Sequence, residues 1–234
     1  MIAGVTVEPG DVVVADATGV VLVPRARAAQ VLDLATAVQE RERAIAADLR
    51  AGCHSPKPCT MPDSPDSTRS PVDRCDHYHR EMAALPTAAV SDALDALGLP
   101  GALHGIGPLT DTARAVGPAF TVRFEPITDE PGTVGDFLDD VPAGAVVVID
   151  NAGRTDCTVW GGIMTTLATA KGVAGAVVHG VCRDVATAFA LGYPMFSAGR
   201  FMRTGKDRVR CVAGSTLARA RAELGYHTLQ SRTP

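Results

Sequence analysis

Strand-like and helix-like segments alternate along residues 87–211, and this alternation constrains the fold more than any other feature of the chain. Apolar runs typical of strands lie at 115–124, 145–150, 175–179 and 194–197. Apolar positions at helical spacing lie at 87–97, 160–171 and 184–191. Because strands that alternate with helices usually form a layered parallel sheet, the pattern predicts an α/β fold.

The first fifty residues have a pattern of their own. Short strands are predicted at 4–8, 11–15 and 19–24, and a long helix is predicted from Arg25 to about Arg50. The apolar stripe of this helix includes Val38 and Ile45, and Glu42 falls between them at the same spacing. We therefore expect Glu42 on the apolar face of the helix, where a salt-bridged carboxylate is the simplest structural explanation.

Residues 53–76 divide the chain. They read CHSPKPCTMPDSPDSTRSPVDRCD, are rich in Pro, Ser and Asp, and lack an apolar period, which predicts a flexible linker. The predicted organisation is an N-terminal segment at 1–52, the linker, a main α/β body with the site at 77–213 and a helical tail at 214–234. A linker of about 24 residues has an r.m.s. span of roughly 25–29 Å, which is enough for the N-terminal segment to fold back on the body.

The composition argues against several classes of protein. The net charge is −4, and the 22 basic residues are scattered, so no nucleic-acid footprint is predicted. No run approaches about 18 consecutive apolar residues, and the start MIAGVTVEPGD lacks the features of a signal peptide. We therefore expect a cytoplasmic protein without a membrane partner.

A zinc site in the linker region is an alternative that the cysteines and histidines raise. The candidate ligands are Cys53, His54, Cys59, Cys75, His77 and His79. They contain no Cys-x-x-Cys pair, and their proline-rich flanks would not hold them in a fixed geometry. The six cysteines of the chain are also too irregular in spacing for a disulfide framework.

Two predicted junctions between a strand and a helix carry the residues best suited to bind a ligand. Gly161-Gly162-Ile163-Met164 opens one helix, and Arg183-Asp184 opens the next. Helix N-termini at strand ends attract anions, and glycines let a ligand approach the backbone. Each feature also has a structural explanation: Asp184 as a helix N-cap, Arg183 as a surface ion pair, and the glycines as a turn.

The second half of the chain contains the run WGGIMTTLATAKGVAGAVVHGVCRDV, followed by GYPMFSAGRFMRTGKDRV. Together these runs resemble the signature of the 4-hydroxy-4-methyl-2-oxoglutarate aldolase family, which also contains the regulator of ribonuclease activity A. The earlier runs TAAVSDAL, RAVGPAFTVR and GAVVVID match the same family, so the resemblance covers residues 87 to about 211 in order.

The N-terminal run GVTVEPGDVVVADATGVVLVP resembles the part that closes proteins of this family, although here it opens the chain. This order implies either a circular permutation across the linker or the tail of one copy fused to the body of another. In the family, a strand leads into that closing part. The sequence after Arg210 (CVAGSTLARARAELG) is expected to lack it.

The resemblance implies a swivelling β/β/α domain assembled as a homotrimer or a hexamer, with its sites between subunits. By position, the backbone at Gly161 to Met164 would hold the carboxylate of a small 2-keto acid, and Arg183 would bind the substrate's oxygens. Asp184 would hold Mg²⁺ or Mn²⁺. A further acid comes from a neighbouring subunit in the family, and Glu42 is our candidate for it. The implied activity is metal-dependent C–C bond cleavage that releases pyruvate.

Two departures from the family's pattern bear on the reaction. Gly162 stands where active aldolases often carry an acid, and His179 stands where many members carry Asp. His179 either titrates near neutral pH or caps its strand. Retro-aldol cleavage needs a base, whereas oxaloacetate decarboxylation needs only the metal, so we expect decarboxylation to exceed aldolase activity. The alternative is a non-catalytic regulator that binds a protein partner such as ribonuclease E, which would leave Arg183 and Asp184 without a chemical task.

Overall fold

The computed structural model describes residues 1–50, 74–128 and 134–214. In chain order its elements are β1 (Val12–Ala15), β2 (Val20–Val23), η1 (Arg25–Arg27), α1 (Ala28–Arg50), α2 (Arg74–Met82), α3 (Thr87–Ala96), β3 (Gly107–Pro108), β4 (Ala115–Pro126), η2 (Asp136–Asp140), β5 (Val146–Thr158), α4 (Gly162–Ala170), β6 (Gly175–Cys182), α5 (Val185–Leu191), β7 (Met195–Arg200) and β8 (Val209–Gly214). Within these ranges, no helix combines the length and the apolar character needed to cross a membrane.

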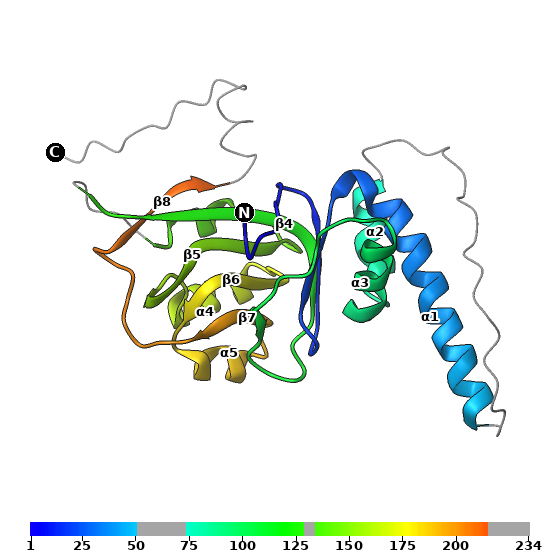
Figure 1. Ribbon diagram of the computed structural model, residues 1–234. Coiled ribbons are helices and arrows are strands. Elements are labelled where there is room, and N and C mark those ends of the chain that lie inside the picture. The colour runs from blue at the N-terminus through cyan, green and yellow to red at the C-terminus, as the bar shows by residue number, and fades with distance from the viewer. Residues whose placement is uncertain (51–73, 129–133, 215–234) are drawn as a thin grey trace.

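One mixed sheet of eight strands forms the centre of the described structure. Its order is β2-β1-β4-β5-β6-β7-β3, and β8 also pairs with β4. Strands β4, β5, β6 and β7 are parallel, with α4 connecting β5 to β6 and α5 connecting β6 to β7. The predicted α/β fold is therefore confirmed. Because parallel strands end at the same edge of a sheet, the residues that follow β5 and β6 lie close together (Figure 1).

The parallel strands are buried on both faces. On one face, Trp160, Met164 and Ala188 pack with side chains of β4 to β7 into a core that α4, α5 and η2 cover. On the other face, Val148 and Val177 pack against the N-terminal residues Ile2 and Val5 and against the loop that follows α3. Strands covered on both sides read as continuous apolar runs, which is why AVVVI and GAVVH stood out in the sequence.

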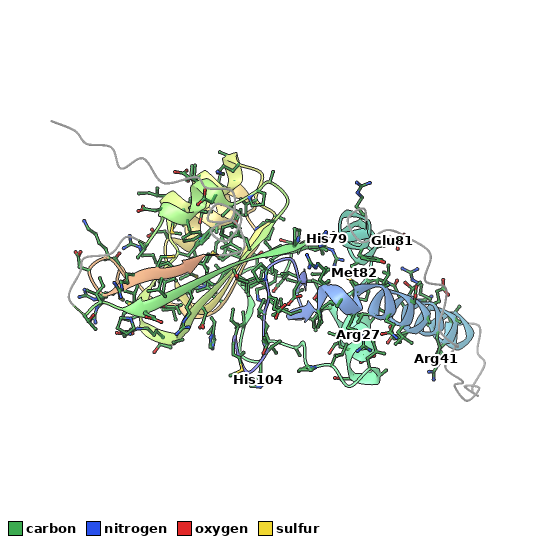
Figure 2. All side chains as sticks on the ribbon, turned by 90° about the horizontal axis from the view of Figure 1, so that it is seen from above. Arg27, Arg41, His79, Glu81, Met82 and His104 are labelled. Carbon is green, nitrogen blue, oxygen red and sulfur yellow. The ribbon has the colours of Figure 1, made fainter. Side chains whose placement is uncertain are left out.

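A layer of three helices covers the outer face of the β1–β2 hairpin. Val12 and Val14 of β1 pack with Val31 and Ala35 of α1 and with side chains of α2 and α3, which include Leu94. The second half of α1 runs past this core and projects from the body (Figure 1), and Figure 2 shows the same projection from above, with Arg41 on the projecting half. Residues 1–50 thus pack against their own chain, through the antiparallel pairing of β1 with β4 and through α1 against α3.

The N-terminus of α3 receives its cap from a residue 71 positions earlier. Pro86 precedes the helix and offers no side-chain cap. The Asp16 carboxylate, in the turn between β1 and β2, accepts hydrogen bonds from Thr87 N–H (2.9 Å) and Thr87 Oγ1 (2.7 Å). Arg114 Nη1 lies 3.8 Å from the same carboxylate. These contacts hold the N-terminal hairpin against the rest of the fold.

Four expectations are corrected or bounded by the structure. Residues 4–8 do not form a strand: Ile2 and Val5 make a single bridge around a turn in which Ala3 and Gly4 have positive φ values. The chain after Arg210 does not lack a strand, because Cys211 to Gly214 lie in β8. The predicted linker ends earlier than expected, since α2 begins at Arg74. The rest of the linker and the predicted helical tail beyond Gly214 lie outside the described residues.

Candidate active site

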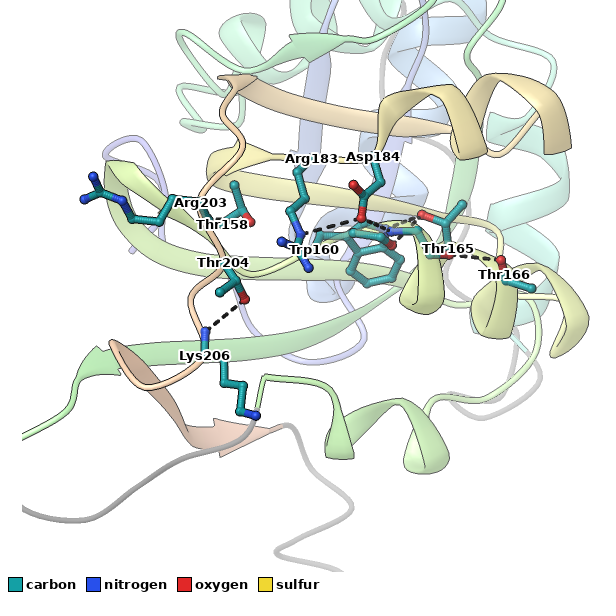
Figure 3. Close-up of polar contacts among 11 residues, drawn as sticks. Thr158, Trp160, Thr165, Thr166, Arg183, Asp184, Arg203, Thr204 and Lys206 are labelled. Atoms are coloured by element: carbon teal, nitrogen blue, oxygen red, sulfur yellow. Dashed lines mark hydrogen bonds and ion pairs between the residues drawn. The ribbon is translucent and has the colours of Figure 1, made fainter.

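The predicted site residues come together where β5 and β6 end. Gly161 and Gly162 open α4 after β5, and Arg183 and Asp184 stand between β6 and α5. Figure 3 shows Arg183 and Asp184 close to Trp160 and Thr165, which flank the glycine pair in the sequence. The carboxyl ends of parallel strands are the usual binding edge of such sheets.

Asp184 does not cap its own helix. It has the left-handed conformation (φ 54°, ψ 37°) and makes no side-chain hydrogen bond to α5. Its Oδ2 instead accepts a hydrogen bond from the backbone N–H of Gly162, at 3.0 Å. The role of helix N-cap, which the sequence suggests for Asp184, is therefore not the one that its side chain has. A non-glycine residue in this backbone region is strained, and such strain is commonly retained at functional sites.

Arg183 lies beside this carboxylate. Its backbone N–H donates to Trp160 O at 3.1 Å, which fixes the end of β6 against the loop before α4. Its Nε lies 3.5 Å from Asp184 Oδ2, and the two side chains are 38% and 49% exposed. The guanidinium is therefore close to Asp184 but still open to solvent, so it has donors left for a ligand.

Gly161 and Gly162 lie in close contact with side chains at the start of α5. A Cβ on Gly161 would lie 2.9 Å from Asp184 Oδ2 and 3.2 Å from Arg183 Nε. A Cβ on Gly162 would lie 3.0 Å from Thr187 Oγ1 and 3.3 Å from Asp184 Cβ. A Cβ on Gly161 would force the Asp184 carboxylate or the loop to shift, and a Cβ on Gly162 would make tight contacts with Thr187 and Asp184. From the sequence alone, the two glycines could equally have served a turn; the structure shows that they lie against side chains of the site.

Two consecutive hydrogen bonds, from Trp160 to Thr165 and from Thr165 to Gly161, hold the start of α4 in place. Trp160 Nε1 donates to Thr165 Oγ1 at 2.9 Å, and Thr165 Oγ1 donates to Gly161 O at 3.0 Å. The Trp160 ring stacks on Tyr193, with 6.0 Å between ring centroids. Sequence reasoning missed this support, because a buried threonine and an indole N–H cannot be paired from their spacing alone. Burial of the hydroxyl of Tyr193 raises its pKa above its ordinary value.

The loop between β7 and β8 is hydrogen-bonded to the end of β5. Thr158 N–H donates to Arg203 O at 2.9 Å, and Gly205 N–H donates to Thr158 O at 2.8 Å. Figure 3 shows Arg203, Thr204 and Lys206 on this loop, with the side chains of Arg203 and Lys206 directed away from Arg183. The loop thus anchors the end of β5 beside the predicted site.

Three predicted residues differ in how the structure places them. Met164 is buried in the core, and Ile163 is 88% exposed on the first turn of α4, so only their backbone N–H groups are suited to a ligand. Glu42 is exposed on the projecting half of α1 and not on a buried apolar face. The structure does not bring it to Arg183 and Asp184 of its own chain, so its role in a neighbouring subunit's site stays a prediction.

His179 pairs with Asp150 on the adjacent strand. The two residues are register partners in β6 and β5, and His179 Nδ1 lies 3.2 Å from Asp150 Oδ1. Gly153 has φ 67°, and a Cβ there would lie 3.2 Å from His179 Nε2. Because Val148, Asp150, Val177 and His179 alternate on the sheet face away from α4 and α5, this pairing favours a structural role for His179.

The donor set at Asp184 fits a hard divalent cation held largely by water and substrate. Among residues 1–50, 74–128 and 134–214, no three His, Cys, Asp or Glu side chains gather into a metal-binding group. One oxygen of the half-exposed Asp184 carboxylate is bound by Gly162, which leaves the other for a ligand. Mg²⁺ and Mn²⁺ accept one carboxylate with several waters, whereas structural zinc needs four ligands. The candidate zinc ligands Cys53, His54 and Cys59 lie outside the described residues.

Comparison with known proteins identifies relatives of this arrangement. The chain is 36% identical over 181 residues to protein DlpA of Legionella pneumophila, covering 76% of this chain and 28% of that protein. It is 34% identical over 128 residues to a Halalkalibacterium halodurans protein named "Putative 4-hydroxy-4-methyl-2-oxoglutarate aldolase", covering 54% and 58%. The chain therefore spans between about a quarter and three fifths of the length of these two relatives.

Among solved structures, the fold matches an "uncharacterized protein" from Pseudomonas syringae pv. tomato with a TM-score of 0.54 and 46% sequence identity. That match covers 58% of this chain and 64% of the other. Residues 87–219, more than half of the sequence and including the whole glycine and Arg-Asp constellation, match the family described as RraA-like, Aldolase/RraA. This chain belongs to the RraA-like family.

Proposed function

We propose that this chain is a divalent-metal-dependent lyase that cleaves a C–C bond of a small 2-keto acid and releases pyruvate. The observation that carries the proposal is that Asp184 Oδ2 lies 3.0 Å from the backbone nitrogen of Gly162 at the start of α4 and 3.5 Å from Arg183 Nε. The name of the family includes aldolases, and the Halalkalibacterium halodurans relative carries an aldolase name. Oxaloacetate decarboxylation is the reaction that this site supports best.

Each group has a chemical task in this proposal. Asp184 holds Mg²⁺ or Mn²⁺, which when bound supplies a Lewis acid for the keto and carboxylate oxygens of the substrate. The first-turn N–H groups of Ile163 and Met164, which have no acceptor within their own helix, bind the substrate carboxylate. Gly162 N–H is already committed to Asp184 and orients it.

Arg183 acts on the charge that develops during cleavage. In decarboxylation, the electron pair of the broken C–C bond moves toward the keto group as CO₂ leaves, and water then returns a proton to the carbon. The Arg183 guanidinium donates hydrogen bonds to the keto oxygen, where negative charge accumulates. The distance of 3.5 Å between Arg183 Nε and the Asp184 carboxylate, which would hold the metal, supports this role for the guanidinium.

The same geometry disfavours retro-aldol cleavage. That reaction needs a base to remove the proton of the substrate alcohol, and Gly162 provides no side chain. A side chain there would also meet Thr187 and Asp184. We therefore expect aldol substrates to be cleaved more slowly than oxaloacetate is decarboxylated.

The assembly is part of the proposal. We place the working site in a homotrimer, or a hexamer, in which the projecting half of α1 reaches a neighbouring subunit and supplies Glu42. The exposure of Glu42 and the projection of α1 from the body support this placement. We further propose that the domain is a swivelling β/β/α domain in permuted order, since residues 1–50 complete the sheet of the body through β1.

The decisive experiment is pyruvate release from oxaloacetate, with and without Mg²⁺, by the wild type and by Asp184→Ala. Protein-free Mg²⁺ is the blank, because the free ion itself decarboxylates oxaloacetate. Asp92→Ala is the matched control, since it removes an exposed carboxylate on α3. The proposal requires metal-dependent turnover above the blank that Asp184→Ala loses and Asp92→Ala keeps. Wild-type protein no faster than the blank, with oxaloacetate and with an aldol substrate, would rule it out.

A regulator that binds a protein partner is the second candidate, because the family also carries the RraA name and Gly162 lacks an acid. In that case the exposed apolar side chains beside the site, Ile163 and Met202, would serve contact and not catalysis. The two candidates separate in the same assay. A regulator gives no metal-dependent turnover, and its Asp184→Ala variant behaves like the wild type.

A further inference from the structure

Thr187 lies against Gly162 and Asp184, although neither the sequence nor the family comparison points to it. It belongs to the first turn of α5, and its N–H donates to Asp184 O at 3.0 Å. Its hydroxyl oxygen lies 3.0 Å from the point that a Cβ on Gly162 would occupy, and that point is 3.6 Å from Asp184 Oδ2. The hydroxyl therefore stands between the start of α4 and the start of α5, next to the Asp184 carboxylate.

The hydroxyl of Thr187 differs from the other hydroxyls of this region. Thr165, Thr166 and Thr169 each donate to the backbone carbonyl four residues earlier, at 2.8–3.0 Å. Those bonds satisfy the hydroxyls inside α4. Among the described residues, Thr187 Oγ1 has no such partner, although its side chain is partly buried. A partly buried hydroxyl with a free donor, beside a helix N-terminus and an arginine, is suited to an anion.

We propose that Thr187 Oγ1 is a substrate-contacting group that donates a hydrogen bond to the carboxylate of the bound 2-keto acid. This inference rests on the proposed function for the identity of the ligand. Thr187 and the first-turn N–H groups of α4 then form a carboxylate cradle on one side of Asp184, while Arg183 serves the keto oxygen. The site thereby selects a free carboxylate next to a carbonyl, and it rejects the corresponding esters and amides.

Gly162 leaves room for the Thr187 hydroxyl. A Cβ at position 162 would stand 3.0 Å from Thr187 Oγ1, a tight contact that the hydroxyl would relieve by a shift of a few tenths of an ångström. A side chain at 162 would therefore crowd the hydroxyl that the cradle uses.

The test is the affinity for oxalate, a stable dicarboxylate that mimics an enolised 2-keto acid. Isothermal titration in the presence of Mg²⁺, with a blank titration into buffer, measures it on the full chain without turnover. Thr187→Val removes the hydroxyl at constant shape, Thr187→Ser restores it, and Thr169→Val is the control on a hydroxyl bonded within α4. We expect oxalate to bind about tenfold more weakly to Thr187→Val and normally to the other two, since hydrogen bonds to charged groups are worth roughly that factor.

Several results would overturn the inference. Equal oxalate affinity in Thr187→Val and the wild type would do so, and so would a wild type that binds no oxalate. A Thr187→Val variant that loses Mg²⁺ affinity without oxalate would show that the hydroxyl acts through Asp184 and not on the ligand. Failure of the proposed function is a separate result: the wild type then releases no pyruvate, while the oxalate titrations of the variants still measure the cradle.

Discussion

The Asp184 carboxylate accepts a hydrogen bond from the backbone N–H of Gly162, at the start of a different helix, and makes none to its own helix. This contact joins the N-termini of α4 and α5 through one side chain. It orients a carboxylate in a site where Arg183 is 3.5 Å away. The relationship accounts for the adjacent Arg and Asp after β6: the strand end carries both, and the left-handed turn at Asp184 directs its carboxylate back toward α4.

The left-handed backbone of Asp184 predicts that two substitutions which both abolish activity differ in their effect on stability. Asp184→Gly and Asp184→Ala both remove the carboxylate, but only glycine adopts φ 54° without strain. We expect the glycine variant to be more stable than the alanine variant by about 1 kcal/mol. Both should lose metal-dependent activity. Chemical denaturation of the two variants measures the difference, and equal midpoints would show that the turn is not strained.

Gly161 is predicted to be intolerant of alanine. The added Cβ would lie 2.9 Å from Asp184 Oδ2, which real Cβ contacts do not allow, so the carboxylate or the loop must shift. We expect Gly161→Ala to lower metal-dependent activity by at least about tenfold, the effect of roughly 1.4 kcal/mol in the transition state. Gly107→Ala is the control, since no atom lies within 4 Å of its Cβ position. The idea fails if both variants keep wild-type turnover.

Thr165→Val is predicted to loosen the support beneath the glycines. It leaves the indole N–H of Trp160 without its acceptor and removes a donor from Gly161 O, which costs about 1–3 kcal/mol of stability for a buried group. Trp160 is the single tryptophan of the chain, so its fluorescence reports the change directly. Thr169→Val should have almost no effect on either reading. A Thr165→Val variant with unchanged fluorescence and stability would contradict the predicted linkage.

Asp16 predicts a dependence of stability on pH. Partial burial acts to raise the pKa of Asp16, but hydrogen bonds from Thr87 and Thr18 outweigh burial and hold the pKa below its ordinary value. A carboxyl whose pKa is lower in the folded state stabilises the fold above its unfolded pKa of about 3.9, and the stabilisation is lost as the pH falls through the folded pKa.

Asp16→Ala should therefore destabilise the protein by about 1–2 kcal/mol at neutral pH, the typical value of an N-cap. The difference from the wild type should shrink in acid, where the wild-type carboxyl is protonated. Denaturation of the wild type, Asp16→Ala and the control Asp92→Ala at neutral and acidic pH measures this. A difference that stays constant down to the lowest pH at which the protein folds would exclude the capping role.

The proposed contribution of Glu42 to a neighbouring site predicts complementation between inactive subunits. With an aldol substrate, whose cleavage needs proton transfer, Glu42→Gln and Asp184→Ala should each lower the turnover of a homo-oligomer, because each removes one carboxylate from every site. Co-expression of the two variants should restore part of the activity, since some sites then combine a wild-type Glu42 with a wild-type Asp184. Size-exclusion chromatography establishes the oligomer in the same samples. No recovery in mixed oligomers would place Glu42 outside the site.

Local sequence patterns predicted an element reliably where burial of apolar side chains alone determined its sequence. The apolar runs of β5 and β6 are buried on both faces, and α3 carries a clear apolar period, so the starts of both strands and both ends of α3 were predicted within one residue. The strands themselves run further than predicted, β5 to Thr158 and β6 to Cys182, because their last residues include polar side chains and glycines that break the apolar run. The strand expected at 4–8 failed because the positive φ of Ala3 and Gly4 turns the chain back on itself. Helix α2 was missed because its sequence, RCDHYHREM, is mostly polar, and Met82, which is fully buried, stands at its last position.

The sequence by itself determined the α/β class, the family and the identity of the pair Arg183 and Asp184, because these depend on periodicity and on motifs contiguous in the chain. The tertiary structure alone decided that Asp184 turns to Gly162, that Asp16 caps α3, and that Thr187 stands against Gly162. Asp184 and Gly162 lie 22 positions apart in the sequence, and Asp16 and Thr87 lie 71 positions apart. The separation of Thr187 from Gly162 falls between these two values. Their distances follow from the crossing of strands and helices in space, and no local propensity encodes them.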